Sequence, residues 1–244
     1  MKVRIVDIMR DRMIRSSKVA SDLFTIQFKW SLWYVAVIVL MHILVSFISE
    51  SGIFAVSYGA SPTYMLVIGI VVGNFLPFYV KNGVTRKDYF IGVTLAALGL
   101  SFALAIVFSI LSSFESLIYS YLNLGIIIEP FKLQLNIDGS NNWLVSVLIY
   151  SLNIYVFYLI GWFIHLGLYR YKWMTGIGFC VSAFIFAFLQ RSLWNDQLFS
   201  IFAIENAYMA SNFSIFIAIM GTIVLIGIIL CLIRLFTKKI PIKI

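Results

Sequence analysis

Charged residues are scarce in this chain of 244 residues. They make up 11% of it, whereas hydrophobic residues make up 62%. A soluble domain has about 25% charged and about 45–50% apolar residues. No soluble fold could bury so much apolar surface, so the composition indicates an integral membrane protein. The only two cysteines, Cys180 and Cys231, lie within apolar runs. This placement excludes a disulfide framework and indicates two small buried hydrophobic side chains.

Motifs for catalysis and metal binding are also missing from the sequence. It has no G-x-x-x-x-G-K-[ST] phosphate loop, so the chain cannot hydrolyse a nucleotide alone. H-E-x-x-H, Cys-x-x-Cys and G-x-S-x-G are absent as well. We therefore predict no catalytic residue, no cofactor site and no metal ligand, and expect a non-enzyme. His42 and His165 are interpreted as hydrogen-bonded packing residues rather than proton sites.

Long apolar runs predict an all-α integral membrane protein with six transmembrane helices. About 20 apolar residues at 1.5 Å per residue cross a hydrocarbon core of roughly 30 Å. Together the predicted spans form a membrane domain over residues 28–236, followed by a short tail at 237–244. The six spans cover about 28–48, 62–80, 89–111, 143–168, 174–189 and 213–235.

The N-terminal residues 1–27 are more polar and are predicted to form a separate amphipathic helix in the cytoplasmic headgroup layer. Charged residues fall at helical spacing on one face of this segment, and Val6, Met9 and Met13 fall on the opposite face. Membrane lipid is therefore an expected partner. The alternative is a solvated tail whose amphipathic pattern arises by chance.

The positions of the cations predict the orientation of the chain. With these spans, 16 of the 18 lysines and arginines lie on one side of the membrane, and only Lys132 and Arg191 lie on the other. The positive-inside rule then places both termini in the cytoplasm of a multi-pass cell-membrane protein. Because the cations are scattered over four short segments, a nucleic-acid partner is not expected.

A polar island separates the second and third predicted spans. It reads Lys81-Asn82-Gly83-Val84-Thr85-Arg86-Lys87-Asp88 and is predicted to form a tight cytoplasmic turn. Asn82-Gly83 is a strong turn dipeptide because glycine tolerates positive φ. Thr85 precedes Asp88 by three residues, which is typical of a capping box, so a helix is predicted to begin at Thr85.

Small residues and prolines mark predicted contacts and bends. Gly69 and Gly73, and the stripe of Gly92, Ala96 and Gly99, predict close approaches between helices. Pro62 is expected in the first turn of the second span. Pro77 is expected to kink that span next to the turn, as a hinge or as a packing adjustment.

The stretch over residues 112–142 is the longest predicted outer segment. Its apolar first half, Phe114 to Ile128, is interpreted as a re-entrant or interfacial element. A second outer loop over 191–211 is expected to hold an interfacial helix over 198–209.

The run Asn82-Gly83-Val84-Thr85-Arg86-Lys87-Asp88-Tyr89-Phe90 resembles the N-G-[VI]-[ST]-R-[KR]-x-x-F stretch of certain ABC transporter permeases. These permeases belong to the type 2 exporter family, mostly of the Gram-positive bacterial type. The resemblance implies that Asn82, Gly83, Val84, Thr85, Arg86, Lys87 and Asp88 form the coupling helix that docks on a separate ATPase. It also implies ATP and Mg in that ATPase and a second permease chain, identical or related.

An apolar pathway between two such chains would suit a hydrophobic or amphipathic cargo, such as a peptide or an antibiotic-like molecule. Arg86 and Lys87 would help to seat the turn on the ATPase; the alternative is that they only set the topology against anionic lipid. A second hypothesis is a non-transporting sensor or immunity protein that binds a peptide at its outer loops.

Overall fold

The computed structural model describes residues 2–46, 53–121, 143–170, 173–194 and 211–238. In these ranges all regular structure is helical. The elements are α1 (Lys2–Ser46), α2 (Ile53–Val72), the 3₁₀ turn η1 (Gly73–Phe75), α3 (Leu76–Lys81), α4 (Arg86–Tyr121), α5 (Trp143–Arg170), α6 (Trp173–Trp194) and α8 (Ser211–Lys238).

Six segments of these helices are long and apolar enough to cross a membrane, which confirms the predicted class of fold. They run over Ile14–Leu44, Gly59–Lys81, Arg86–Ile118, Trp143–Tyr169, Gly176–Trp194 and Phe216–Lys238. The second segment crosses η1 and so joins α2 to α3.

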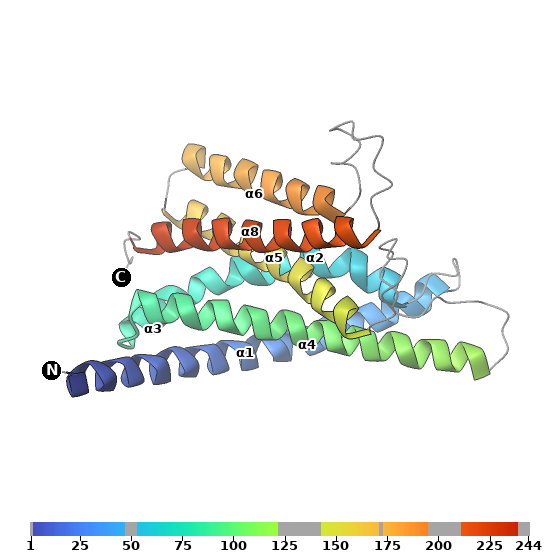
Figure 1. Ribbon diagram of the computed structural model, residues 1–244, viewed down its shortest axis with the longest axis horizontal. Coiled ribbons are helices and arrows are strands. Elements are labelled where there is room, and N and C mark those ends of the chain that lie inside the picture. The colour runs from blue at the N-terminus through green and yellow to red at the C-terminus, as the bar shows by residue number, and fades with distance from the viewer. Residues whose placement is uncertain (1, 47–52, 122–142, 171–172, 195–210, 239–244) are drawn as a thin grey trace.

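Helix α5 forms the centre of the bundle and contacts α2, α4, α6 and α8 (Figure 1). Its Tyr150, Ile154, Tyr158 and Trp162 are all buried. Helix α1 packs mainly along α4, whereas α6 lies on the opposite side of the bundle. The N-terminal end of α1, the C-terminal end of α8 and the α3–α4 turn lie at one end of the molecule (Figure 1).

The predicted separate helix over residues 1–27 is wrong, because α1 runs unbroken from Lys2 to Ser46. This stretch contains no glycine or proline that would end a helix. Val19, Leu23 and Gln27 recur at helical spacing and are buried, and a side chain of Val19 lies beside Gly92 of α4. Val19 and Phe24, in the second half of the segment that was expected to lie flat in the headgroups, therefore pack on α4 instead. The side chains of Val6, Met9 and Met13 lie outside the described residues.

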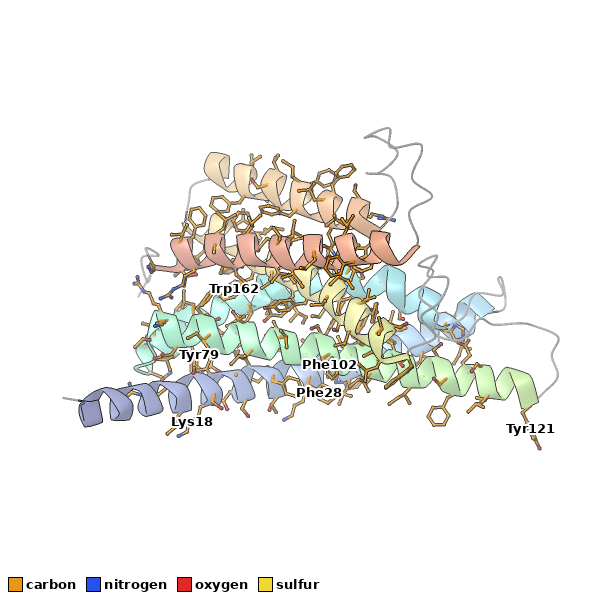
Figure 2. All side chains as sticks on the ribbon, viewed as in Figure 1. Lys18, Phe28, Tyr79, Phe102, Tyr121 and Trp162 are labelled. Carbon is orange, nitrogen blue, oxygen red and sulfur yellow. The ribbon has the colours of Figure 1, made fainter. Side chains whose placement is uncertain are left out.

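Helices α2 and α4 are longer than predicted. Pro62 lies inside α2 rather than in its first turn, since α2 begins at Ile53. Helix α4 continues to Tyr121 at the end of the bundle opposite the turn (Figure 2). Residues 114–121, predicted to start a re-entrant element, therefore extend α4, and Glu115 is buried on this helix. The rest of that element and the predicted helix over 198–209 lie outside the described residues.

The predicted small residues lie at helix contacts within this one chain. A Cβ atom on Gly69 would overlap the carbonyl oxygen of Tyr158, and one on Gly161 would overlap that of Leu66, so α2 and α5 touch backbone to backbone. The other predicted small residues line contacts to α1 or α5, or are buried: Gly73 against His165, Gly92 against Val19, Gly99 against Phe24, and Ala96 in the core. These faces are thus occupied internally and do not offer a surface to a second chain.

A seam of polar side chains runs between α1, α2 and α5. Gln27 donates to the hydroxyl of Tyr158 at 2.9 Å, and the Ser31 and Tyr64 hydroxyls lie 2.8 Å apart. Farther along α1, the Tyr34 hydroxyl lies 3.0 Å from that of Ser61. Because buried polar groups are costly unless they are hydrogen-bonded, this seam fixes the register of the three helices.

Candidate functional site at the α3–α4 turn

The site begins where the second span changes helix type. Pro77 has no amide proton to donate to the carbonyl of Gly73, four residues earlier. The chain tightens into η1, and the amide of Leu76 donates to Gly73 instead. Pro77 then lies in the first turn of α3, where its missing donor costs nothing. The interruption is therefore located where the sequence placed the bend, one turn before Asn82.

Tyr89 of α4 joins this interruption to the next helix. Its buried hydroxyl donates to the carbonyl of Val72, the last residue of α2. The Tyr89 ring also lies 5.6 Å from that of Tyr79 on α3 and edge-on to Trp162 of α5, at 6.5 Å between centroids. Figure 2 shows Tyr79 and Trp162 in the half of the bundle that holds the turn. Through these contacts, a displacement of α3 would be transmitted to both α4 and α5.

The turn itself is closed by backbone hydrogen bonds. The amide of Gly83 donates to Val80 at 3.1 Å, and that of Val84 donates to Tyr79 at 3.0 Å. Gly83 has a φ of 80°, a conformation that side chains other than glycine rarely adopt. The side-chain amide of Asn82 donates to the backbone carbonyl of Phe78 at 2.9 Å and so caps the end of α3.

Thr85 and Asp88 cap the beginning of α4. The Thr85 hydroxyl oxygen accepts from the Asp88 amide at 3.1 Å and donates its proton to the Asp88 carboxylate at 2.7 Å. The carbonyl of Thr85 accepts from the Tyr89 amide at 2.9 Å, as an N-cap carbonyl does. Helix α4 therefore begins one residue after Thr85, and the buried Asp88 stands at the positive end of its dipole.

Arg86 links the turn to the last helix of the bundle. Its guanidinium donates to the backbone carbonyl of Lys238 at 2.8 Å, across 152 residues of sequence. One turn farther along α4, the Phe90 ring lies under the guanidinium of Arg234, 5.5 Å from its centroid. A cation at a helix C-terminus is favourable, so Arg86 stabilises the end of α8 as well as the turn.

Most polar side chains of the turn are exposed at the surface. These are Lys81, Asn82, Thr85 and Lys87, whereas Asp88 is buried. The exposed surface is thus cationic, with lysines on both sides of the Asn82-Gly83 tip. Three sets of hydrogen bonds hold the turn rigidly: those that close the turn, those of the Thr85 cap, and the bond from Arg86 to α8.

The residues of the turn were predicted from the sequence, but the contacts of the turn with distant helices were not. The structure places Asn82 to Asp88 in one turn with Pro77 beside it. The contacts of Arg86 with Lys238 and of Tyr89 with Val72 were not foreseen. Neither pair carries a local signal, since each depends on how α4 packs against another helix. Arg234 belongs to the 16 cations that were predicted to lie on the cytoplasmic side, and no further role was predicted for it.

No metal cluster of three or more His, Cys, Asp or Glu side chains occurs among the described residues. Comparison of the chain with protein-family models, with curated proteins and with solved structures gave no match, so a proposal about its function rests on the residues described above.

Proposed function

We propose that this chain is the transmembrane permease subunit of an ABC exporter whose ATPase is a separate chain. The observation that carries the proposal is the rigid, capped, cationic turn between α3 and α4, in a sequence that resembles the coupling segment of type 2 exporters. The missing phosphate loop supports a division of labour in which ATP and Mg bind to the partner. The apolar helices support a hydrophobic or amphipathic cargo, such as a peptide or an antibiotic-like molecule.

In this proposal the ATPase contacts the exposed Lys81 and Lys87, while Arg86 acts inside the permease. Closure of the ATPase pushes the turn, and α4 transmits the push along its length because Thr85 and Asp88 cap its beginning. The η1 interruption lets α3 tilt relative to α2. Tyr89 and Arg86 carry the displacement to the centre of the bundle and to α8.

The second permease chain would have to use a surface other than the internal small-residue faces. Gly178 on α6 has no heavy atom within 4 Å of a Cβ built on it. This open position would permit a neighbouring helix to approach the α6 side of the bundle. The proposal is thus a dimer of identical or related chains in the cell membrane, with both termini and the turn in the cytoplasm.

Co-purification tests the proposal. A tagged chain should retain an ATPase, and Lys87→Glu should lower the ATP turnover of that complex or release the ATPase. Lys18→Glu, the same charge change at an exposed position on another helix, α1 (Figure 2), should do neither. A chain that purifies without any ATPase, yet binds a peptide from outside, would favour the sensor or immunity hypothesis instead. An unchanged turnover with a stable Lys87→Glu complex would contradict coupling at this turn.

A further inference from the structure

Three cations gather where the beginning of α4 meets the end of α8. Arg86 is hydrogen-bonded to the carbonyl of Lys238, and Arg234 lies one helical turn before Lys238 on α8. Phe90, one turn after Arg86, holds the guanidinium of Arg234 over its ring. Arg86, Arg234 and Lys238 thus lie at the junction of these two helices and are hereafter called the α4–α8 cation cluster.

No carboxylate of the described residues lies within ion-pair distance of this cluster. One guanidinium nitrogen of Arg234, Nη1, is buried and has no hydrogen-bond partner in the described part of the chain. Three neighbouring positive charges repel one another, and a covered donor without an acceptor is costly. The rest of Arg234 is only partly covered and Lys238 is exposed, so an anion can approach both.

An apolar stripe continues from the cluster along α8. Val224, Ile228 and Leu235 are 61%, 47% and 59% exposed, and together with the exposed Cys231 they follow helical spacing. Lys238 lies in line with this stripe and Arg234 borders it. A ligand that meets both features has an anionic head beside Arg234 and Lys238 and a hydrocarbon tail along α8.

We infer that the α4–α8 cation cluster binds the phosphate of an anionic phospholipid, whose acyl chain lies on the α8 stripe. Arginine and lysine are the usual partners of lipid phosphates at the membrane surface. The cluster stands at the ends of two candidate spanning segments, Arg86–Ile118 and Phe216–Lys238, and the end of a span is where a lipid headgroup meets the chain. The bound phosphate would neutralise the cluster and hold α8 to the beginning of α4. This inference holds whether or not the chain is a permease.

The test uses the full-length chain, delipidated in a neutral detergent, with its unfolding followed by tryptophan fluorescence. Phosphatidylglycerol should raise the Tm relative to phosphatidylcholine, on the order of 5 °C at about 100 Kd. The double variant Arg234→Gln/Lys238→Gln should lose most of this shift. Lys87→Gln, which removes the same charge from an exposed position at the turn, should keep it.

Two further measurements keep the inference falsifiable if the double variant folds poorly. Lys238→Gln alone changes only an exposed side chain and should need several-fold more phosphatidylglycerol for half of the shift. Inorganic phosphate at the same concentration should give little shift, because it has no tail to bury. An equal shift with inorganic phosphate would overturn the lipid assignment, and an undiminished shift in both variants would overturn the site.

Discussion

The Nε2 atom of His42 lies 2.7 Å from the Oε1 atom of Glu115, which joins α1 to α4 at the end of the bundle opposite the turn. Both side chains are about nine-tenths buried, and Nδ1 of His42 has no hydrogen-bond partner among the described residues. The sequence analysis placed Glu115 in the predicted re-entrant or interfacial element of the outer segment, so this contact with α1 was not expected. Substitutions in this pair measure how much this polar contact stabilises the packing of α1 in the bundle.

Breaking the His42–Glu115 pair should destabilise the chain. His42→Ala and Glu115→Ala should each lower the free energy of unfolding by about 1–3 kcal/mol, because each leaves a buried polar partner. The double variant should lose less than the sum of the two, with a coupling energy of about 0.5–3 kcal/mol. Denaturant unfolding in detergent measures all four forms. Strictly additive losses would show that the two side chains do not interact.

Enlarging the glycine contact between α2 and α5 should separate the two helices. Gly69→Val places side-chain atoms where the Tyr158 backbone lies, and we expect a loss of roughly 1–3 kcal/mol or more, as in other overpacked cores. Gly227→Ala is the matched control, since a Cβ there meets nothing within 4 Å. It should stabilise α8 by about 0.5–1 kcal/mol. Thermal unfolding of both variants checks the prediction; a neutral Gly69→Val would contradict the close contact.

Removing the cap of α4 should loosen the start of this helix. Thr85→Ala loses both hydrogen bonds with Asp88 and should cost about 1 kcal/mol, whereas Thr85→Ser keeps the hydroxyl and should cost far less. Hydrogen–deuterium exchange at Tyr89 and Phe90 reports the opening of this turn directly. Equal exchange in the two variants would mean that the hydroxyl does not cap α4.

Deleting the Tyr89 hydroxyl should weaken the connection across η1. Tyr89→Phe leaves the Val72 carbonyl without this donor, and we expect a loss of about 1–3 kcal/mol in unfolding free energy. Tyr121→Phe is the control, because Tyr121 is exposed at the far end of α4. If both variants unfolded like the parent chain, the Tyr89 bond would contribute nothing to stability.

The orientation can be tested with single cysteines. In a chain carrying Cys180→Ser and Cys231→Ser, Lys87→Cys should react with an impermeant maleimide only after the cells are opened. Ser140→Cys, in the predicted outer segment, should react in intact cells. Labelling of Lys87→Cys in intact cells would place the turn outside and refute the proposed docking of a cytoplasmic ATPase.

Much of the fold was predictable because apolar length and turn residues act locally. The start of the fourth span at Trp143 and the capped turn at Thr85 followed from the order of residues alone. Helix ends without a strong stop were predicted less well. Helix α4 extends ten residues past the predicted end at residue 111, because Glu115 has a partner, His42, on α1.

The sequence by itself determined that this chain is a helical membrane protein and that a cationic turn follows the second span, because hydrophobic length, glycine and capping residues need no distant partner. Tertiary structure alone decided that the N-terminal segment continues into α1, since Val19 and Leu23 are buried and Val19 packs on a helix some 70 residues later in the chain. It also decided that Arg86 binds the end of α8. Contacts of this kind depend on which helix faces which, and no local pattern of residues encodes that choice.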